Sequence, residues 1–96
     1  METLDPLLHS QLRLAIMSLL IAGESAEFTF IKKKTGATAG NISVQLDKLS
    51  EAGYLRIEKS FDGKRPKTQC YITKDGIAAF EKYVKTLQDY INPKSA

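Results

Sequence analysis

Residues 38–53 read Thr38-Ala-Gly-Asn-Ile-Ser-Val-Gln-Leu-Asp-Lys-Leu-Ser-Glu-Ala-Gly53. Ile42, Leu46 and Leu49 recur at intervals of four and three residues, which is the spacing of one apolar face of an α-helix. We expect Thr38 to cap the N-terminus of this helix and Gly53 to end it. The stretch therefore predicts a helix with one buried face and one polar face.

A second short helix is expected just before it, at roughly 29–35, and Gly36 stands where a left-handed residue would end that helix. The tight connection Gly36-Ala37 then joins two helices, which is the helix-turn-helix arrangement. Farther toward the N-terminus, Asp5-Pro6 and Ser10 are alternative helix starts. Apolar residues recur at helical spacing up to Gly23, so we expect a first core helix at roughly 10–22.

The segments 54–60 and 67–73 alternate in the manner of β-strands, and the turn sequence Asp62-Gly-Lys-Arg-Pro66 lies between them. They predict a hairpin with a basic tip. Thr73 is expected to cap a last helix at roughly 74–91, which ends before Asn92-Pro93 because proline cannot continue a helix. The expected fold is α+β, mainly α: a single winged helix-turn-helix domain over residues 1–96. It consists of a three-helix core with the helix-turn-helix at about 29–53, a wing at about 54–73 and a C-terminal dimerisation helix at about 74–91.

The charge is unevenly distributed along the chain. The 96 residues carry 14 Lys plus Arg and 11 Asp plus Glu, for a net charge of +3. Residues 32–74 hold ten basic and four acidic residues, and the rest holds four basic and seven acidic ones. A basic segment of this kind is what binding to a phosphate backbone requires, although a solvated basic surface is the alternative.

The inventory of reactive side chains argues against catalysis. The chain has one His and one Cys, too few for a zinc site of four Cys or His ligands, and it has no glycine-rich phosphate loop. We expect His9 at the surface or at an interface and Cys70 as a buried small hydrophobe. The sequence predicts a protein that is not an enzyme and uses no metal or cofactor. A single cysteine and the lack of a run of about 20 apolar residues favour a cytoplasmic protein without a membrane span.

Three runs resemble a known family. Asn41-Ile-Ser-Val-Gln-Leu-Asp-Lys-Leu-Ser-Glu-Ala-Gly-Tyr-Leu55 resembles the recognition helix of MarR- and ArsR-type bacterial and archaeal repressors. Lys59-Ser-Phe-Asp-Gly-Lys-Arg-Pro-Lys-Thr68 resembles their wing, and Tyr71-Ile-Thr-Lys-Asp-Gly76 the start of their final helix. The resemblance covers about residues 5–91 and is strongest to compact MarR-like regulators. It implies a dimeric transcriptional regulator that binds specific sites on double-stranded DNA. ArsR-type metal sensing would need ligand clusters, from which this chain departs.

The expected DNA contacts follow from helical geometry, because the N-terminal part of a recognition helix enters the major groove. Asn and Gln can bind adenine with two hydrogen bonds, a valine can contact a thymine methyl group, and a glycine lets the backbone approach a phosphate. The candidates on this helix are Thr38, Gly40, Asn41, Ser43, Val44, Gln45 and Lys48. On the preceding helix, Lys32, Lys33 and Lys34 cover the exposed side, and one or two of them, with Lys32 and Lys33 as the candidates, are expected to contact phosphates. The resemblance implies that the wing, with Lys64, Arg65 and Lys67, reaches a minor groove, where Arg65 is favoured. For each residue, ordinary solvent exposure is the alternative.

The last helix carries a second pattern. Ile77, Phe80, Val84, Leu87 and Ile91 are spaced 3, 4, 3 and 4 residues apart, as in a heptad seam. Leu4, Leu7 and Leu8 near the N-terminus are further apolar residues that must be buried. Together they predict a homodimer on a pseudo-palindromic DNA site, with packing of both ends within a monomer as the alternative. The expected interface residues are Leu4, Leu7, Leu8, Phe80, Val84, Leu87 and Ile91.

Two other functions remain open at this point. A winged helix can serve as a protein-interaction module of a transcription complex, which predicts an uncharged or apolar recognition surface. The lysine-rich middle of the chain favours DNA instead. RNA binding is disfavoured because the aromatic residues show no pattern of exposed stacking platforms. The sequence carries no information on a small-molecule effector.

Overall fold

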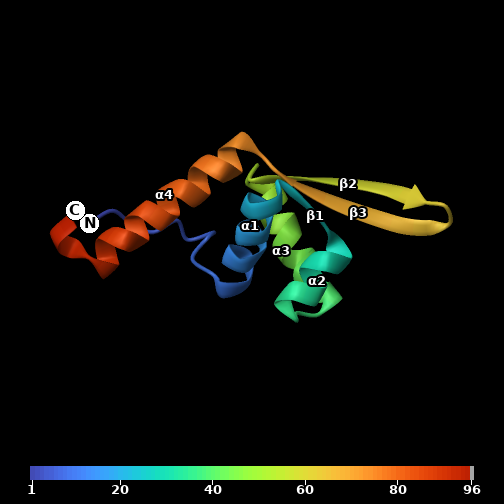
Figure 1. The fold of residues 1–96 in the computed structure, drawn as a ribbon, viewed down its shortest axis with the longest axis horizontal. Helices are drawn as coiled ribbons and strands as arrows, with labels where there is room; N and C mark the ends of the chain where they lie inside the picture. The colour runs from blue at the N-terminus through green and yellow to red at the C-terminus, as the bar shows by residue number, and fades with distance from the viewer. Residues whose placement is uncertain (96) are drawn as a thin grey trace.

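The computed structural model describes residues 1–95. The elements are α1 (Gln11–Gly23), β1 (Ser25–Glu27), α2 (Phe28–Thr35), α3 (Ala39–Glu51), β2 (Leu55–Asp62), β3 (Arg65–Ile72), α4 (Lys74–Ile91) and the short 3-10 helix η1 (Pro93–Ser95). Helices α1 to α3 gather at one end of the sheet, the β2–β3 hairpin extends to one side of them, and α4 extends to the other (Figure 1). The molecule is therefore elongated, with extents of 55 × 25 × 21 Å. The expected winged-helix architecture is confirmed.

Side-chain caps begin three of the four main helices. Ser10, Thr38 and Thr73 each accept a hydrogen bond from the backbone N–H three residues later. Ser10 is therefore the true start of α1, and Asp5 instead closes a turn by accepting from the Leu7 N–H at 2.9 Å. Gly36 ends α2 with φ +71°, a left-handed conformation that glycine adopts without a Cβ penalty. The expected helix bounds are correct to within one residue.

The sheet has one strand more than the sequence predicts. Strand β1 pairs antiparallel with β3, so the order is β1-β3-β2. A segment of three residues is too short to show an alternation pattern, so β1 could not be predicted from the sequence. The β2–β3 ladder continues out to Asp62 and Arg65, so the turn consists of Gly63 and Lys64 alone. The prediction that Pro66 belongs to the turn is wrong, since it lies within β3 opposite Phe61.

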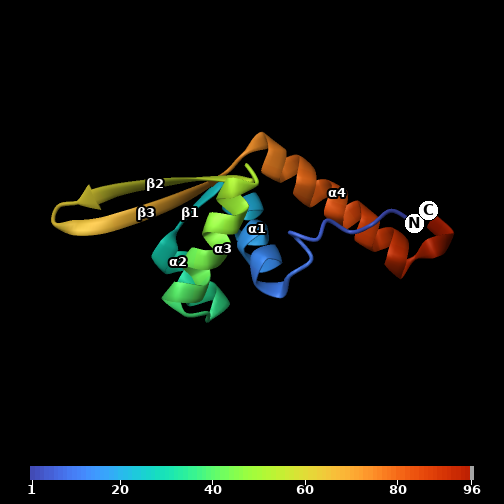
Figure 2. The same ribbon diagram turned by 180° about the vertical axis from the view of Figure 1, so that it is seen from behind.

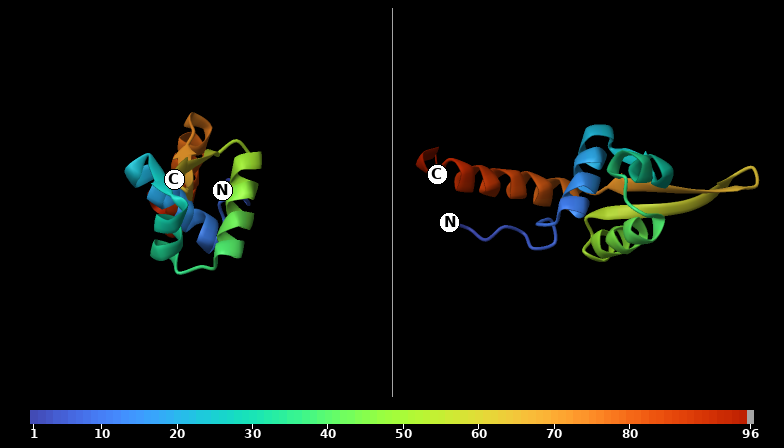
Figure 3. Two further views of the ribbon diagram at one scale, coloured as in Figure 1. Left: turned by 90° about the vertical axis from the view of Figure 1, so that its right-hand side faces the viewer. Right: turned by 90° about the horizontal axis from the view of Figure 1, so that it is seen from below.

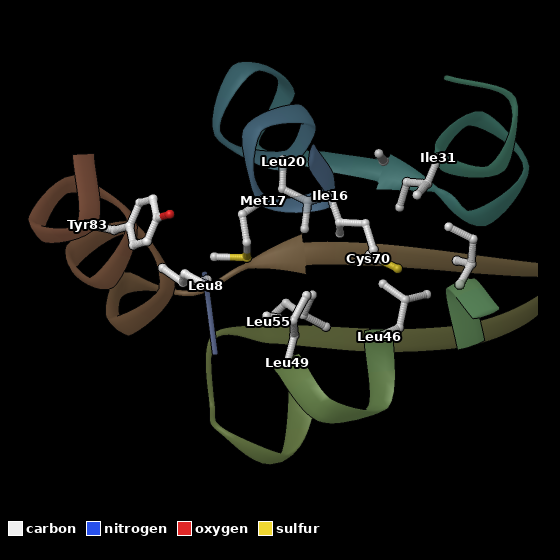
Figure 4. Close-up of a cluster of buried hydrophobic side chains, with 12 residues drawn as sticks. Leu8, Ile16, Met17, Leu20, Ile31, Leu46, Leu49, Leu55, Cys70 and Tyr83 are labelled. Atoms are coloured by element: carbon white, nitrogen blue, oxygen red, sulfur yellow. The ribbon is translucent and has the colours of Figure 1, made fainter. Parts of the chain in front are cut away.

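The core lies between the three helices and the inner half of the sheet. Figure 4 shows side chains from α1, α3 and the strands pointing toward one another around Cys70. Cys70 is completely buried, as expected, and burial raises the pKa of its thiol to about 11. Its neighbours in this cluster include Ile16, Met17, Leu20, Ile31, Ile42, Leu46, Leu49 and Leu55. The three apolar residues of the 42–49 stripe are thus the buried face of α3.

The N-terminal segment lies alongside α4, and the two chain ends meet at the outer end of that helix (Figures 2 and 3). The Tyr90 hydroxyl donates to the Glu2 carbonyl at 2.7 Å, and the Tyr83 hydroxyl lies 2.9 Å from Nδ1 of His9. Tyr83 and Thr86 are the buried side chains of α4. The face of α4 that packs on its own chain is therefore centred on these residues, and it overlaps the edge of the heptad seam, since Phe80 and Leu87 also pack against the protomer's core.

A backbone junction joins α3, the hairpin and α4. The Thr73 N–H donates to the Tyr54 carbonyl at 3.2 Å, and the Thr73 hydroxyl donates to the Gly53 carbonyl at 2.7 Å. The next turn of chain brings Gly76 against the same place, where a Cβ would lie 2.0 Å from the Tyr54 carbonyl oxygen. The Tyr54 side chain is also held, because its hydroxyl donates to Asp5 at 2.6 Å. This hydrogen bond, together with burial, raises the pKa of Tyr54 to about 12.

We expect Gly76→Ala to destabilise the protein by at least about 2 kcal/mol, because the added methyl group overlaps backbone atoms that cannot move aside freely. Urea denaturation followed by circular dichroism measures the change. Gly23→Ala is the matched control, since a Cβ at Gly23 meets nothing within 4 Å. Equal stability of the two variants would show that α4 does not need this close approach.

Candidate nucleic-acid interface

The outward face of α3 is polar and accessible. Thr38, Gly40, Asn41, Ser43, Val44 and Lys48 are all exposed, and Val44 retains 50% of its surface. The opposite face supplies the buried side chains of the core. The division of this helix into two faces is as the sequence predicts, so the candidate base-contacting residues share one surface.

Gln45 differs from the other candidates on α3. It is half-buried, and both ends of its amide have partners within the chain. Its Oε1 accepts from Nη1 of Arg13 at 2.6 Å, and its Nε2 donates to Oδ1 of Asn41 at 2.9 Å. The role of Arg13 could not be predicted from the sequence, because nothing local in α1 indicates a partner 32 residues away.

Helix α2 adds positive charge beside the N-terminus of α3. Lys32, Lys33 and Lys34 are exposed, and the ammonium group of Lys34 lies 5.7 Å from the centre of the Phe30 ring. A shallow hollow at the α2–α3 turn is lined by Thr29, Lys32, Lys33, Gly36 and Ala37. Two cationic side chains therefore flank the turn that leads into α3.

The wing extends this basic surface. Lys64 and Arg65 are exposed at the tip, and Lys67 is half-buried. Because side chains alternate along a strand, Lys59 and Phe61 follow Leu55 and Ile57 on the face that packs against the helices. In Figure 1 the hairpin extends past α2 and α3, on the side away from α4. Lys59 and Phe61 were not among the residues predicted for this surface, although the alternation from Leu55 could have identified them.

The described residues 1–95 contain no group of three or more His, Cys, Asp or Glu side chains arranged to hold a metal ion. None of the helices in this part of the chain is long and apolar enough to cross a membrane. The exposed side chains of α2, α3 and the wing offer hydrogen bonding and positive charge.

The fold and this surface are those of the winged-helix class, and the comparison with known protein families agrees. Residues 12–91 match the family of winged helix DNA-binding domains, and the chain belongs to that family. Its candidate surface is the part of the fold that carries the recognition helix and the wing.

Particular relatives are archaeal and bacterial. An uncharacterised protein of Methanocaldococcus jannaschii is 38% identical over 76 residues, which cover 79% of this chain and 83% of that protein. The structure of a transcriptional regulator homologue from Pyrococcus horikoshii is similar with a TM-score of 0.85 at 27% identity, covering 94% of this chain and 89% of the other. A mutant of MarR from E. coli, in complex with operator DNA, has a TM-score of 0.74 at 17% identity and covers 93% and 63%. That last likeness concerns the fold alone.

Gly40 offers a test that separates stability from binding. A Cβ at Gly40 would meet nothing within 4 Å, so the protein itself has no need of glycine there. Gly40→Ala should stabilise the fold by about 0.5–1 kcal/mol through helix propensity. If a phosphate approaches this backbone, the same change should weaken DNA binding about tenfold. Thermal denaturation and fluorescence anisotropy measure the two effects, with Gly23→Ala as control. Unchanged DNA affinity would remove Gly40 from the interface.

Proposed function

We propose that this protein is a dimeric transcriptional regulator that binds specific sites on double-stranded DNA. Helix α3 enters the major groove, and the wing lies at an adjacent minor groove. The observation that carries the proposal is the common surface formed by the exposed face of α3, the lysines of α2 and the basic wing. Family membership supports DNA as the partner.

Roles follow from side-chain chemistry. Asn41 and Val44 contact base edges, because a carboxamide pairs with adenine and an isopropyl group fits a thymine methyl group. Lys32, Lys33 and Lys48 contact phosphates, which sets the position of the protein on the duplex. Arg65 enters the minor groove, where a narrow A·T tract concentrates negative potential. Thr38 and Ser43, at the flanks of α3, add contacts to the sugar-phosphate backbone.

The dimer is proposed from apolar surface on α4. Ile77 is 38% exposed and Ile91 is 74% exposed. Ile77, Phe80 and Val84 also line a groove of about 570 Å³ together with Ile21 and Ile72. A second copy of the chain, docked along α4, would cover this stripe. Of the expected N-terminal contributors, Leu4 and Leu7 are half-buried against their own core.

Two expected interface residues need revision. Leu8 is 0% exposed within the protomer, so it has no surface left for a partner and is not part of the proposed interface. Leu87 is half-buried and packs against the protomer's own core, so a substitution there would disturb both folding and association. Val84 and Ile91 are the better positions at which to test the dimer.

Salt dependence tests DNA as the partner. The protein is first used to select a preferred site from random duplex DNA, and its affinity is then measured between about 50 and 200 mM salt. With six phosphate contacts per dimer, log affinity should fall with log salt at a slope of about −5. Lys32→Ala should make that slope shallower by about 0.9 for each protomer bound, whereas Lys82→Ala, on α4, should leave it unchanged. A flat dependence, or the lack of any selected site, would support the protein-interaction alternative instead.

A double substitution tests the dimer. Val84→Glu with Ile91→Glu places two charges in the proposed interface and spares the three-helix core. We expect a folded monomer whose affinity for the selected site falls by about 100-fold, because the second half-site no longer binds at high effective concentration. Light scattering and anisotropy provide the measurements. Ala78→Glu, at an exposed position on the same helix, is the control. A wild-type protein that is monomeric at micromolar concentration would contradict the proposal.

A further inference from the structure

A directed chain of hydrogen bonds runs from the N-terminal segment to the tip of α3. Nε of Arg13 donates to the Leu7 carbonyl at 2.5 Å, and Nη1 of the same guanidinium donates to Oε1 of Gln45 at 2.6 Å. Nε2 of Gln45 donates to Oδ1 of Asn41 at 2.9 Å. The chain ends on an exposed side chain in the first turn of α3, where a recognition helix contacts bases.

The direction of this chain is fixed by chemistry. A guanidinium group only donates hydrogen bonds, so the Gln45 atom beside it must be the carbonyl oxygen. The other end of the Gln45 amide is then the NH₂ group, which needs an acceptor, and Asn41 must turn its Oδ1 toward it. The Nδ2 group of Asn41 donates no hydrogen bond within residues 1–95, and the Asn41 residue is exposed to solvent. The amide of Asn41 is therefore oriented before any ligand arrives.

The anchor of the chain is rigid. The Arg13 side chain is half-buried on α1, and its planar fork holds two acceptors that lie on different parts of the chain. The backbone of Asn41 is fixed as well, because its N–H donates to Oγ1 of Thr38 at 3.2 Å. Neither end of the chain can swing without breaking a hydrogen bond.

We propose that Arg13 and Gln45 are positioning residues that set the base preference of Asn41. This inference rests on the proposed function. A free asparagine amide can turn over by 180° and present either its oxygen or its nitrogen to a base edge. In this protein the oriented amide offers both Nδ2 protons and one remaining lone pair of Oδ1. That arrangement fits a purine with N7 as acceptor, and adenine best, since the adenine N6 amino group can donate to the oxygen.

Duplexes that carry 7-deazaadenine or 7-deazaguanine test the role, because these bases lack the N7 acceptor. At one purine of each selected half-site, the replacement should lower wild-type affinity about tenfold, and Asn41→Ala should abolish that sensitivity. Arg13→Lys keeps the charge, but a single ammonium group cannot hold both acceptors. It should reduce the penalty to about twofold or less with the same salt slope.

A second variant should reverse the orientation of the Asn41 amide. In Gln45→Glu, the new carboxylate still accepts from Arg13 but cannot donate to Asn41. The Asn41 amide should then turn over, donate from Nδ2 to the carboxylate and present its oxygen to DNA. The 7-deaza penalty should disappear, and the preference at that position should move toward a base with a major-groove donor, such as the N4 amino group of cytosine. Gln11→Glu makes the same chemical change at an exposed position of α1 and should keep the wild-type preference.

The outcomes separate this inference from the proposed function. If the wild type selects a site but Arg13→Lys and Gln45→Glu, both folded by circular dichroism, keep the wild-type 7-deaza penalty, the positioning role is overturned and DNA binding stands. A selected site without any sensitive purine overturns it equally. Should no duplex be selected, both proposals fail. In the free protein, the side-chain amide resonances of Gln45 and Asn41 should shift in Arg13→Lys, and unchanged resonances would show that the chain of hydrogen bonds does not exist in solution.

Discussion

The contact of Gly76 with the Tyr54 carbonyl determines how the three functional parts of this molecule meet. The residues that end α3, begin the hairpin and start α4 lie together at this contact. The Thr73 hydroxyl forms hydrogen bonds with two of these residues. It donates to the Gly53 carbonyl and accepts from the Gly76 N–H. Because a methyl group at Gly76 has no room, the first turn of α4 lies as close to this corner as a helix can. The directions of the recognition helix, the wing and α4 therefore depend on one junction.

That junction explains why α4 has two different apolar faces. Since its first turn is held at the corner, the helix extends away from α1, α2 and α3 (Figure 3). Its contacts with the protomer's core include those of Phe80, Tyr83 and Leu87. The N-terminal segment covers the face around Tyr83 and Thr86. The face with Ile77 and Val84 stays partly open beside Ile21. A monomer can bury one face of such a projecting helix but not both, and the proposed dimer follows from the face that is left.

Signals that are local in sequence predicted most of this fold. The threonine caps, Gly36 and the 42–49 stripe act within a few residues of themselves, and each has the expected role in the structure. Strand β1 could not be predicted, because three residues carry no periodicity and only their pairing with β3 makes them a strand. The complete burial of Leu8, which was expected at a dimer interface, could not be predicted for the same reason. Its cover comes from a core that only the tertiary fold assembles.

The candidate site shows more clearly which features the sequence can predict and which require the tertiary structure. Helical periodicity placed Asn41 on the outward face and Gln45 on its flank, but periodicity treats both as free polar side chains. Arg13 distinguishes them, because it converts Gln45 from a surface amide into the middle of a hydrogen-bonded chain. The same guanidinium holds the Leu7 carbonyl, and the segment before Leu7 is bound to Tyr54 through Asp5. Asn41, the side chain proposed to contact bases, and the junction that directs α4 are thus joined by a continuous series of contacts. The N-terminal segment is the part of the chain through which they connect.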